Sequence, residues 1–132
     1  MPKLNIKIGS LEVFAETTKE CPETVKGVLE NLPIKGEAQR WGEEIYFFVP
    51  FDIAQTGKES QREECEPGEI AFWPAGPAIA IFFGKTPVSR GSKPRAYSPC
   101  NFFARLMNID EKLKVALNSV EDGTEITINK AK

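Results

Sequence analysis

The chain has 132 residues, a formal net charge of −2 at pH 7 and 41% hydrophobic residues. This length and composition predict one domain, residues 1–132, which buries its own core without metal ions or disulfide bonds. The small negative charge gives no general attraction for nucleic acid or anionic lipid, so we expect neither as a partner. Apolar runs such as 78–83 are far shorter than the ~20 residues of a membrane helix, and the N-terminus shows no signal-peptide pattern. We therefore expect a cytoplasmic protein.

The counts of histidine and cysteine exclude several kinds of chemistry. The chain contains no histidine, which excludes hydrolases with an imidazole base and histidine-ligated metal sites. Its three cysteines, Cys21, Cys65 and Cys100, are widely spaced and form no paired motif. We expect them to be reduced structural thiols, and we expect neither a metal nor a cofactor.

The first predicted elements are a hairpin and a helix. Residues 3–8 and 11–16 alternate apolar and polar side chains around a Gly-Ser turn, which predicts an opening β-hairpin. A helix is predicted to begin at Pro22, whose missing N–H has no partner in a first turn, and to end before Pro33. Its apolar face would comprise Val25, Val28, Leu29 and Leu32. Gly27 within it costs about 1 kcal/mol relative to alanine, so we expect packing against its backbone.

The middle of the chain predicts strands. Residues 37–41 and 44–49 are rich in aromatic and β-branched side chains, and Pro50 ends the second segment. Residues 70–73 and 78–83 are short apolar segments separated by a turn with two prolines, which is typical of buried strands. We expect these two strands at the centre of a β-barrel.

Two polar segments and the C-terminal part complete the prediction. Residues 58–69 are mostly acidic and predict an exposed loop, and residues 84–97 predict a basic loop. Residues 101–108 predict a strand, Asp110 is expected to cap a helix, and residues 125–129 predict a last strand. The helix would turn to the core Leu113, Ala116, Leu117 and Val120. Many short strands with a helix near each end of the chain favour a closed barrel over a parallel α/β sheet.

Three segments carry motifs that resemble those of one family. They are residues 69–77 followed by 81–87, residues 41–47, and Ser98-Pro99-Cys100-Asn101 continuing to Arg105. Together with the hairpin and the Pro22 helix they make nearly the whole chain similar to a small group of bacterial and archaeal cyclophilin-like proteins. The resemblance implies a mainly β fold: a closed cyclophilin-like barrel of about eight strands with two short helices capping its ends.

A weaker likeness connects the chain to the true cyclophilins, which are peptidyl-prolyl isomerases. Gly76-Pro77 and the Phe82-Phe83 pair are similar to segments of those enzymes, but their Phe-His-Arg and Gln-Gly-Gly segments have no counterpart here. In cyclophilins an arginine hydrogen-bonds the proline nitrogen while the amide twists, and an apolar pocket holds the ring. Arg40 is the positional candidate for that catalytic arginine. A solvated or stacked surface arginine is the plain alternative.

Aromatic side chains supply a candidate ligand-binding groove. We expect its residues to be Tyr46, Phe48, Trp73, Phe82, Phe83, Tyr97, Asn101, Phe103 and Glu44. The indole N–H of Trp73 needs a partner when buried, and strand alternation lets only one of Phe82 and Phe83 face inward. Alternation also separates Glu43 from Glu44, so the two carboxylates cannot act as an acid–base pair. For most of these aromatics the alternative is simple core packing.

The resemblance and the residues lead to one functional hypothesis with two alternatives. The chain is predicted to be a cyclophilin-like domain that binds a small molecule or a proline-containing peptide in an aromatic groove. The first alternative is an atypical peptidyl-prolyl isomerase that uses Arg40. The second is a barrel subunit of a larger amide-hydrolysing assembly, because cyclophilin-like barrels occur in such assemblies. The sequence specifies neither the natural ligand nor the oligomeric state.

Overall fold

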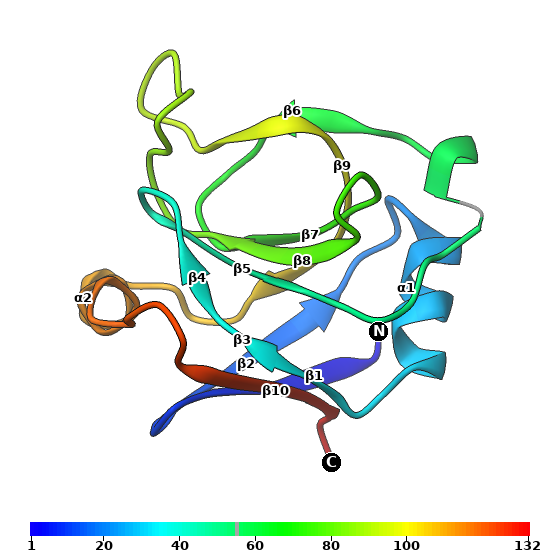
Figure 1. Ribbon diagram of the computed structural model, residues 1–132, viewed down its shortest axis with the longest axis horizontal. Coiled ribbons are helices and arrows are strands. Elements are labelled where there is room, and N and C mark those ends of the chain that lie inside the picture. The colour runs from blue at the N-terminus through cyan, green and yellow to red at the C-terminus, as the bar shows by residue number, and fades with distance from the viewer. Residues whose placement is uncertain (55) are drawn as a thin grey trace.

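Strands make up most of the protein, in agreement with the alternation seen along the sequence. The computed structural model describes residues 1–54 and 56–132 and shows, over these residues, a mainly β fold with two α-helices (Figure 1). The strands are β1 (Lys3–Ile8), β2 (Leu11–Thr17), β3 (Ile34–Glu37), β4 (Gln39–Arg40), β5 (Glu44–Phe48), β6 (Arg62–Glu64), β7 (Glu69–Trp73), β8 (Ala78–Phe82), β9 (Arg95–Leu106) and β10 (Glu125–Lys130).

The strands form one strongly curled sheet. Hydrogen-bonded neighbours follow the order β3-β10-β1-β2-β9-β7-β8-β5-β4, and β6 pairs with β9 off this path. The expected closed barrel is not confirmed, because β3 and β4 end the sheet and are not paired with each other in the described residues. The chain itself crosses this seam, since only Ala38 separates the two strands. Ala38 donates to the carbonyl of Thr124 at 2.7 Å and accepts from the N–H of Gly123 at 2.8 Å.

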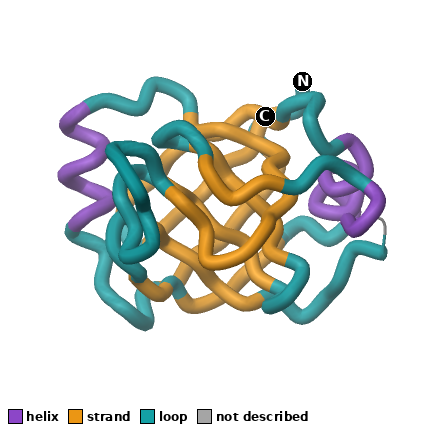
Figure 2. Tube along the Cα trace, turned by 90° about the horizontal axis from the view of Figure 1, so that it is seen from above, coloured by secondary structure: helices purple, strands orange, loops and turns teal. Residues whose placement is uncertain are grey.

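Both predicted helices are confirmed, and they lie on opposite flanks of the strands (Figure 2). Helix α1 (Pro22–Glu30) begins at the predicted proline, and the carboxylate of Glu59 accepts hydrogen bonds from the first-turn N–H groups of Glu23 and Thr24, at 2.6 and 3.0 Å. Helix α2 (Glu111–Asn118) is capped by Asp110, which accepts from the N–H of Leu113 at 2.8 Å. A short 3-10 helix, η1 (Thr56–Lys58), follows the strand β5.

Strands β5, β7 and β8 contribute residues to two separate clusters, one on each of their faces. Their larger aliphatic and aromatic residues enter the main core, which contains Ile45, Phe47, Ile70, Phe72, Ile79, Ile81, Phe83 and Phe103. The opposite face belongs to a second cluster of Cys65, Ala71, Ala80, Phe82, Ala96, Cys100 and Phe102, with Tyr46 and Trp73 at its edge. We call this second cluster the upper cluster, because β6 and β9 arch over β7 and β8 in the upper half of Figure 1.

Two loop predictions need correction. The acidic segment 58–69 contains β6, which pairs with β9 through Arg62 opposite Cys100 and Glu64 opposite Arg95. Strand β9 begins at Arg95 and runs for 12 residues, so it starts earlier than the predicted 101–108. In both cases polar side chains concealed a strand, because β6 and the first half of β9 form an outer layer with one exposed face.

A substitution at Gly27 can test how closely α1 packs against the loop after β5. A Cβ atom at this position would lie 2.8 Å from the side chain of Ile53, so the loop after β5 packs directly on the helix backbone. Gly27→Ala is expected to destabilise the protein by about 1–3 kcal/mol through overpacking, although alanine favours helices. In an Ile53→Ala background the same substitution should be neutral or stabilising. Urea unfolding of the four variants measures this coupling, and equal effects of Gly27→Ala in both backgrounds would contradict it.

Candidate ligand-binding site

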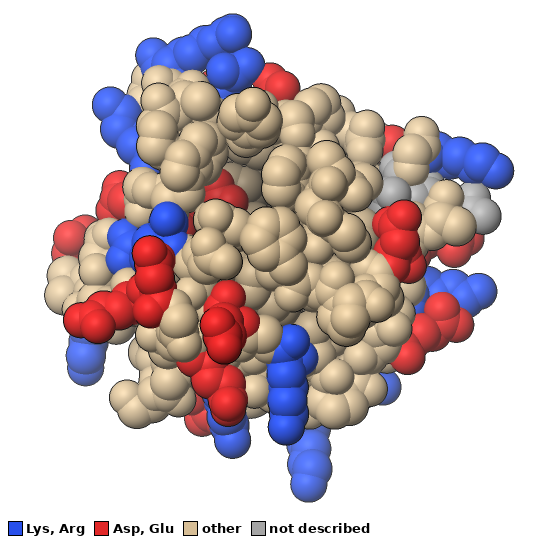
Figure 3. Space-filling view, viewed as in Figure 1, with Lys and Arg blue, Asp and Glu red and all other residues tan. Residues whose placement is uncertain are grey.

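A pocket of about 280 Å³ lies over the upper-cluster face of β5 and β8. Every second residue of β8, namely Ala78, Ala80 and Phe82, lines it. The remaining lining residues are Trp41, Glu44, Tyr46, Phe48, Trp73, Ala96, Tyr97 and Cys100. In the space-filling view the surface over these strands is uncharged and hollowed below the basic loop, with charged side chains at its edges (Figure 3).

The hollow follows from the sequence of β8, which reads Ala-Ile-Ala-Ile-Phe. Alternation turns Ile79 and Ile81 into the main core, while Ala78 and Ala80 face the pocket. Methyl groups on this face leave a space that larger side chains would fill. Small residues therefore form the floor, and larger aromatic side chains from β5, β7 and the loops form the walls.

The aromatic walls are fixed by contacts with one another. Tyr46 and Phe48 stand on β5 with their rings in an edge-to-face arrangement and the centroids 5.8 Å apart. Trp41 and Tyr97 form a second edge-to-face pair at 6.2 Å. The indole N–H of Trp73 donates to Oγ of Ser98 at 2.6 Å, which supplies the partner expected for this group. Phe48 and Tyr97 are 51% and 72% exposed, so they form the rim.

The turn between β4 and β5 brings Trp41 and Glu44 together. The N–H of Trp41 donates to the carbonyl of Glu44 at 3.0 Å. Gly42 adopts a φ of +61° in this turn, and a Cβ there would lie 2.9 Å from the carbonyl of Lys85. Only glycine fits such a position without strain. The short hairpin thus sets one aromatic wall residue beside one carboxyl group.

Glu44 is an acidic side chain in an otherwise apolar pocket. Its exposure is only 8%, and its Oε1 atom has no hydrogen-bond partner among the described residues. Burial raises the pKa of Glu44 to about 8, from an ordinary value of 4.5. At pH 7 this raised pKa favours the protonated carboxyl group. The neighbouring thiol of Cys100 is also kept neutral, since burial raises its pKa to about 12.

Glu43 lies in the turn before β5 and is not among the residues that line the pocket, so the two carboxyl groups are separated as expected. Its carboxylate accepts hydrogen bonds from Nδ2 of Asn118 at 2.9 Å and from the N–H of Lys85 at 3.2 Å. Adjacent carboxylates thus have different roles, because Glu43 ties α2 to the loop after β8 while Glu44 lines the pocket.

Arg40, the catalytic candidate, is engaged elsewhere. Its guanidinium donates to the carbonyls of Asn118 and Val120 at the end of α2, at 3.0 and 3.1 Å, and to the carbonyl of Gly42 at 2.9 Å. The guanidinium carbon lies 5.3 Å from the ring centroid of Phe83. These contacts hold the C-terminal end of α2 against the sheet, and Arg40 is not among the residues that line the pocket.

The structure brings together most, but not all, of the predicted ligand-binding residues. Those that line the pocket are Glu44, Tyr46, Phe48, Trp73, Phe82 and Tyr97. Phe83 and Phe103 are instead fully buried in the main core, because alternation turns them to the opposite face from Phe82 and Phe102. Asn101 is also fully buried, and its Oδ1 accepts from Nε2 of Gln61 at 2.9 Å.

Sequence reasoning missed five lining residues. They are Trp41, Ala78, Ala80, Ala96 and Cys100. The alanines at alternate positions of β8 were a usable signal, because small side chains on one face of a buried strand leave a hollow. Trp41 stood in a family motif, but its position beside Arg40 suggested a surface stack. Cys100 also stood in a family motif, but it was expected to be a structural thiol, and it reaches the pocket because β9 arches over the sheet.

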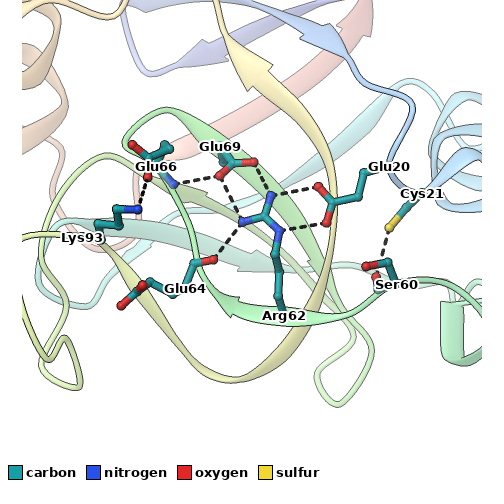
Figure 4. A network of polar contacts seen from close by, with 8 residues as sticks. All are labelled: Glu20, Cys21, Ser60, Arg62, Glu64, Glu66, Glu69 and Lys93. Atoms are coloured by element: carbon teal, nitrogen blue, oxygen red, sulfur yellow. Dashed lines mark hydrogen bonds and ion pairs between the residues drawn. The ribbon is translucent and has the colours of Figure 1, made fainter.

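A polar network around Arg62 holds β6 in place over the upper cluster (Figure 4). The guanidinium carbon lies 4.2 Å from the centroid of the Phe102 ring. Its Nε atom is 2.8 Å from the carboxylate of Glu20, and its other nitrogens donate to the carboxylate of Glu69 and the carbonyl of Glu64. Since Glu20 precedes α1 and Glu69 begins β7, one side chain ties β6 to two other elements.

The described part of the chain contains neither a candidate metal site nor a helix that could span a membrane. In residues 1–54 and 56–132, no three cysteine, aspartate or glutamate side chains are grouped so as to hold a metal ion. Neither α1 nor α2 is long and apolar enough to span a bilayer.

Burial of the Glu44 carboxyl group should make the free energy of unfolding depend on pH. Between about pH 4.5 and 8 the folded state keeps a proton that the unfolded state releases, so the free energy of unfolding should fall as the pH rises. The slope reaches at most about 1.4 kcal/mol per pH unit, and the contribution of Glu44 ends near pH 8, above which the buried thiols continue the decrease. The chain has no histidine to titrate in this range. Glu44→Gln should abolish the slope in urea unfolding series at pH 5 to 8.5, whereas parallel curves would contradict the buried state.

Comparisons with known proteins identify the family. A family model described as cyclophilin-like matches residues 2–129. The hypothetical protein AF2241 from Archaeoglobus fulgidus, solved in solution, is 39% identical with a TM-score of 0.79, over 98% of this chain and 95% of that one. McbB, solved in complex with tryptophan, is 13% identical with a TM-score of 0.72, over 96% of this chain and 44% of that one, and shares the fold alone. A search of curated proteins finds no match. The chain therefore belongs to the cyclophilin-like family.

Proposed function

We propose that this protein is a ligand-binding domain whose pocket over β5 and β8 holds one compact, largely apolar group. An aromatic ring or the proline ring of a peptide fits this description. The observation that carries the proposal is the combination of a preformed hollow, aromatic walls and one buried carboxyl group in the same pocket. Small-molecule sites are typically apolar concavities with a few polar groups that orient the ligand.

The volume of the pocket limits the size of the group that it can bind. Its volume of about 280 Å³ is at the lower end of the range of roughly 300–1,000 Å³ that small-molecule sites occupy. A single ring system with a short substituent would fill it, whereas a dinucleotide or a similarly large cofactor would not. The exposed rim residues Phe48 and Tyr97 leave room for the remainder of a longer ligand to continue into solvent.

The isomerase alternative gains no support from this geometry. An isomerase of the cyclophilin kind needs a guanidinium beside the proline ring. The guanidinium of Arg40 is bound to carbonyl groups at the end of α2, and no arginine or lysine is among the described residues that line the pocket. No observation favours the alternative of a subunit in an amide-hydrolysing assembly either.

Filling the pocket tests the proposal. Ala80 lies on the floor with 2% exposure, so Ala80→Leu places three additional carbons in the hollow. Indole, tryptophan and N-acetylproline amide are suitable probes in titrations followed by amide NMR shifts. Tryptophan is included because a protein with the same fold was solved with it. We expect at least one probe to shift resonances of β5, β8 and β9, and the substitution to weaken its binding by about tenfold or more.

The control enlarges a side chain that is remote from the pocket. Val115 is exposed on α2, and Val115→Leu should leave binding unchanged. The amide spectrum of each variant verifies that it is folded. Shifts confined to another face of the molecule, or undiminished binding by a folded Ala80→Leu variant, would refute the proposed pocket.

A further inference from the structure

The unpartnered oxygen of Glu44 is an observation that general ligand binding does not explain. Its Oε1 atom is buried in the pocket wall and has no hydrogen-bond partner in the described part of the chain. Buried polar atoms in folded proteins are nearly always paired, so an unpaired one at the wall of a cavity indicates a partner that arrives with the ligand. Most other residues that line the pocket are apolar, so a carboxyl group at this position is not required to build the pocket wall.

The charges around the pocket show which kind of partner is missing. The basic side chains nearest to the upper cluster are already engaged: Arg62 with Glu20 and Glu69, and Arg95 with Glu63 at 2.6 Å. Arg40 is bound to carbonyl groups of α2. The other titratable lining groups are the phenols of Tyr46 and Tyr97 and the thiol of Cys100, and none of these carries a positive charge. No lysine or arginine is among the described residues that line the pocket, and burial is the cause of the raised pKa of Glu44, so a positive charge beside this carboxyl group would enter with the ligand.

The aromatic walls favour the same kind of partner. Trp41, Tyr46 and Trp73 line the pocket that contains Glu44. The faces of aromatic rings attract cations, and sets of such rings are known to hold substituted ammonium groups. A carboxyl group and several aromatic rings that line one pocket together attract positive charge and offer little to an anion.

We propose that the ligand of this pocket carries an organic ammonium group, which lies against the carboxylate of Glu44 and between the aromatic rings. This inference rests on the proposed function, because it concerns the same pocket. When the cation enters, the carboxyl group of Glu44 releases its proton to solvent, and the buried charge that forms is paired with the ammonium. An empty pocket therefore holds a neutral carboxyl, and an occupied pocket holds an ion pair.

Two probes of the same shape, one charged and one neutral, distinguish the effect of charge on affinity from the effect of shape. Choline and 3,3-dimethylbutan-1-ol have the same outline, but only choline is positively charged, and its charge is independent of pH. Their affinities are measured by NMR titration at pH 6 and pH 9 for the wild type and for Glu44→Gln. At pH 9 we expect choline to bind the wild type at least about tenfold more tightly than the alcohol. At pH 6 the preference should shrink, because the proton of Glu44 must first be removed.

The variant identifies the source of the preference. Glu44→Gln keeps the shape of the side chain and the aromatic rings, so it should keep only the smaller preference for choline that the rings supply, with no dependence on pH, while its affinity for the alcohol stays close to that of the wild type. Equal binding of the two probes by the wild type at pH 9, or a preference for choline at pH 9 that is as large in the variant as in the wild type, would overturn the inference. The indole and Ala80→Leu titrations would still decide separately whether the pocket binds ligands at all.

Discussion

Strands β7 and β8 are covered on both faces, and this double burial governs the rest of the structure. One face packs the main core, so its residues are large; the other faces the arch of β6 and β9, where the alanines of β8 leave a hollow. A side chain on the second face loses water without gaining a tightly packed environment. For apolar residues this makes a pocket, and for Glu44 it makes a carboxyl group that is buried but not paired.

Arg62 and Glu44 are two ionisable groups beside the upper cluster whose surroundings differ. Arg62 lies on one side of the upper cluster with two carboxylates, a carbonyl and an aromatic ring around it, so its charge is compensated by the chain itself. Glu44 has no such surroundings, although Arg40 is close to it in sequence and is directed to the end of α2. The contrast is the physical reason for placing a ligand beside Glu44.

Local signals predicted the parts of the fold that depend on local chemistry. The Gly-Ser turn, the proline that begins α1, the Asp110 cap and the apolar runs of β7 and β8 each specify their element through neighbouring residues. Strand β6 was missed because its polar residues become a strand only by pairing with β9. Closure of the barrel by hydrogen bonds was not confirmed, and it could not be predicted locally, since hydrogen bonding across the seam depends on the whole curl of the sheet. Phe83 and Phe103 were misplaced because sequence alternation reveals two faces but not which of them contains the pocket.

The protonation state of Glu44 is the quantity on which the account of the site rests. It can be observed directly by labelling glutamate with ¹³C and following the side-chain carboxyl resonance of Glu44 through a pH titration, with Glu44→Gln to assign the signal. Our account predicts a midpoint near pH 8 in the ligand-free protein. A midpoint close to that of an exposed glutamate, near 4.5, would show that the carboxyl group is hydrated or paired and would contradict the account.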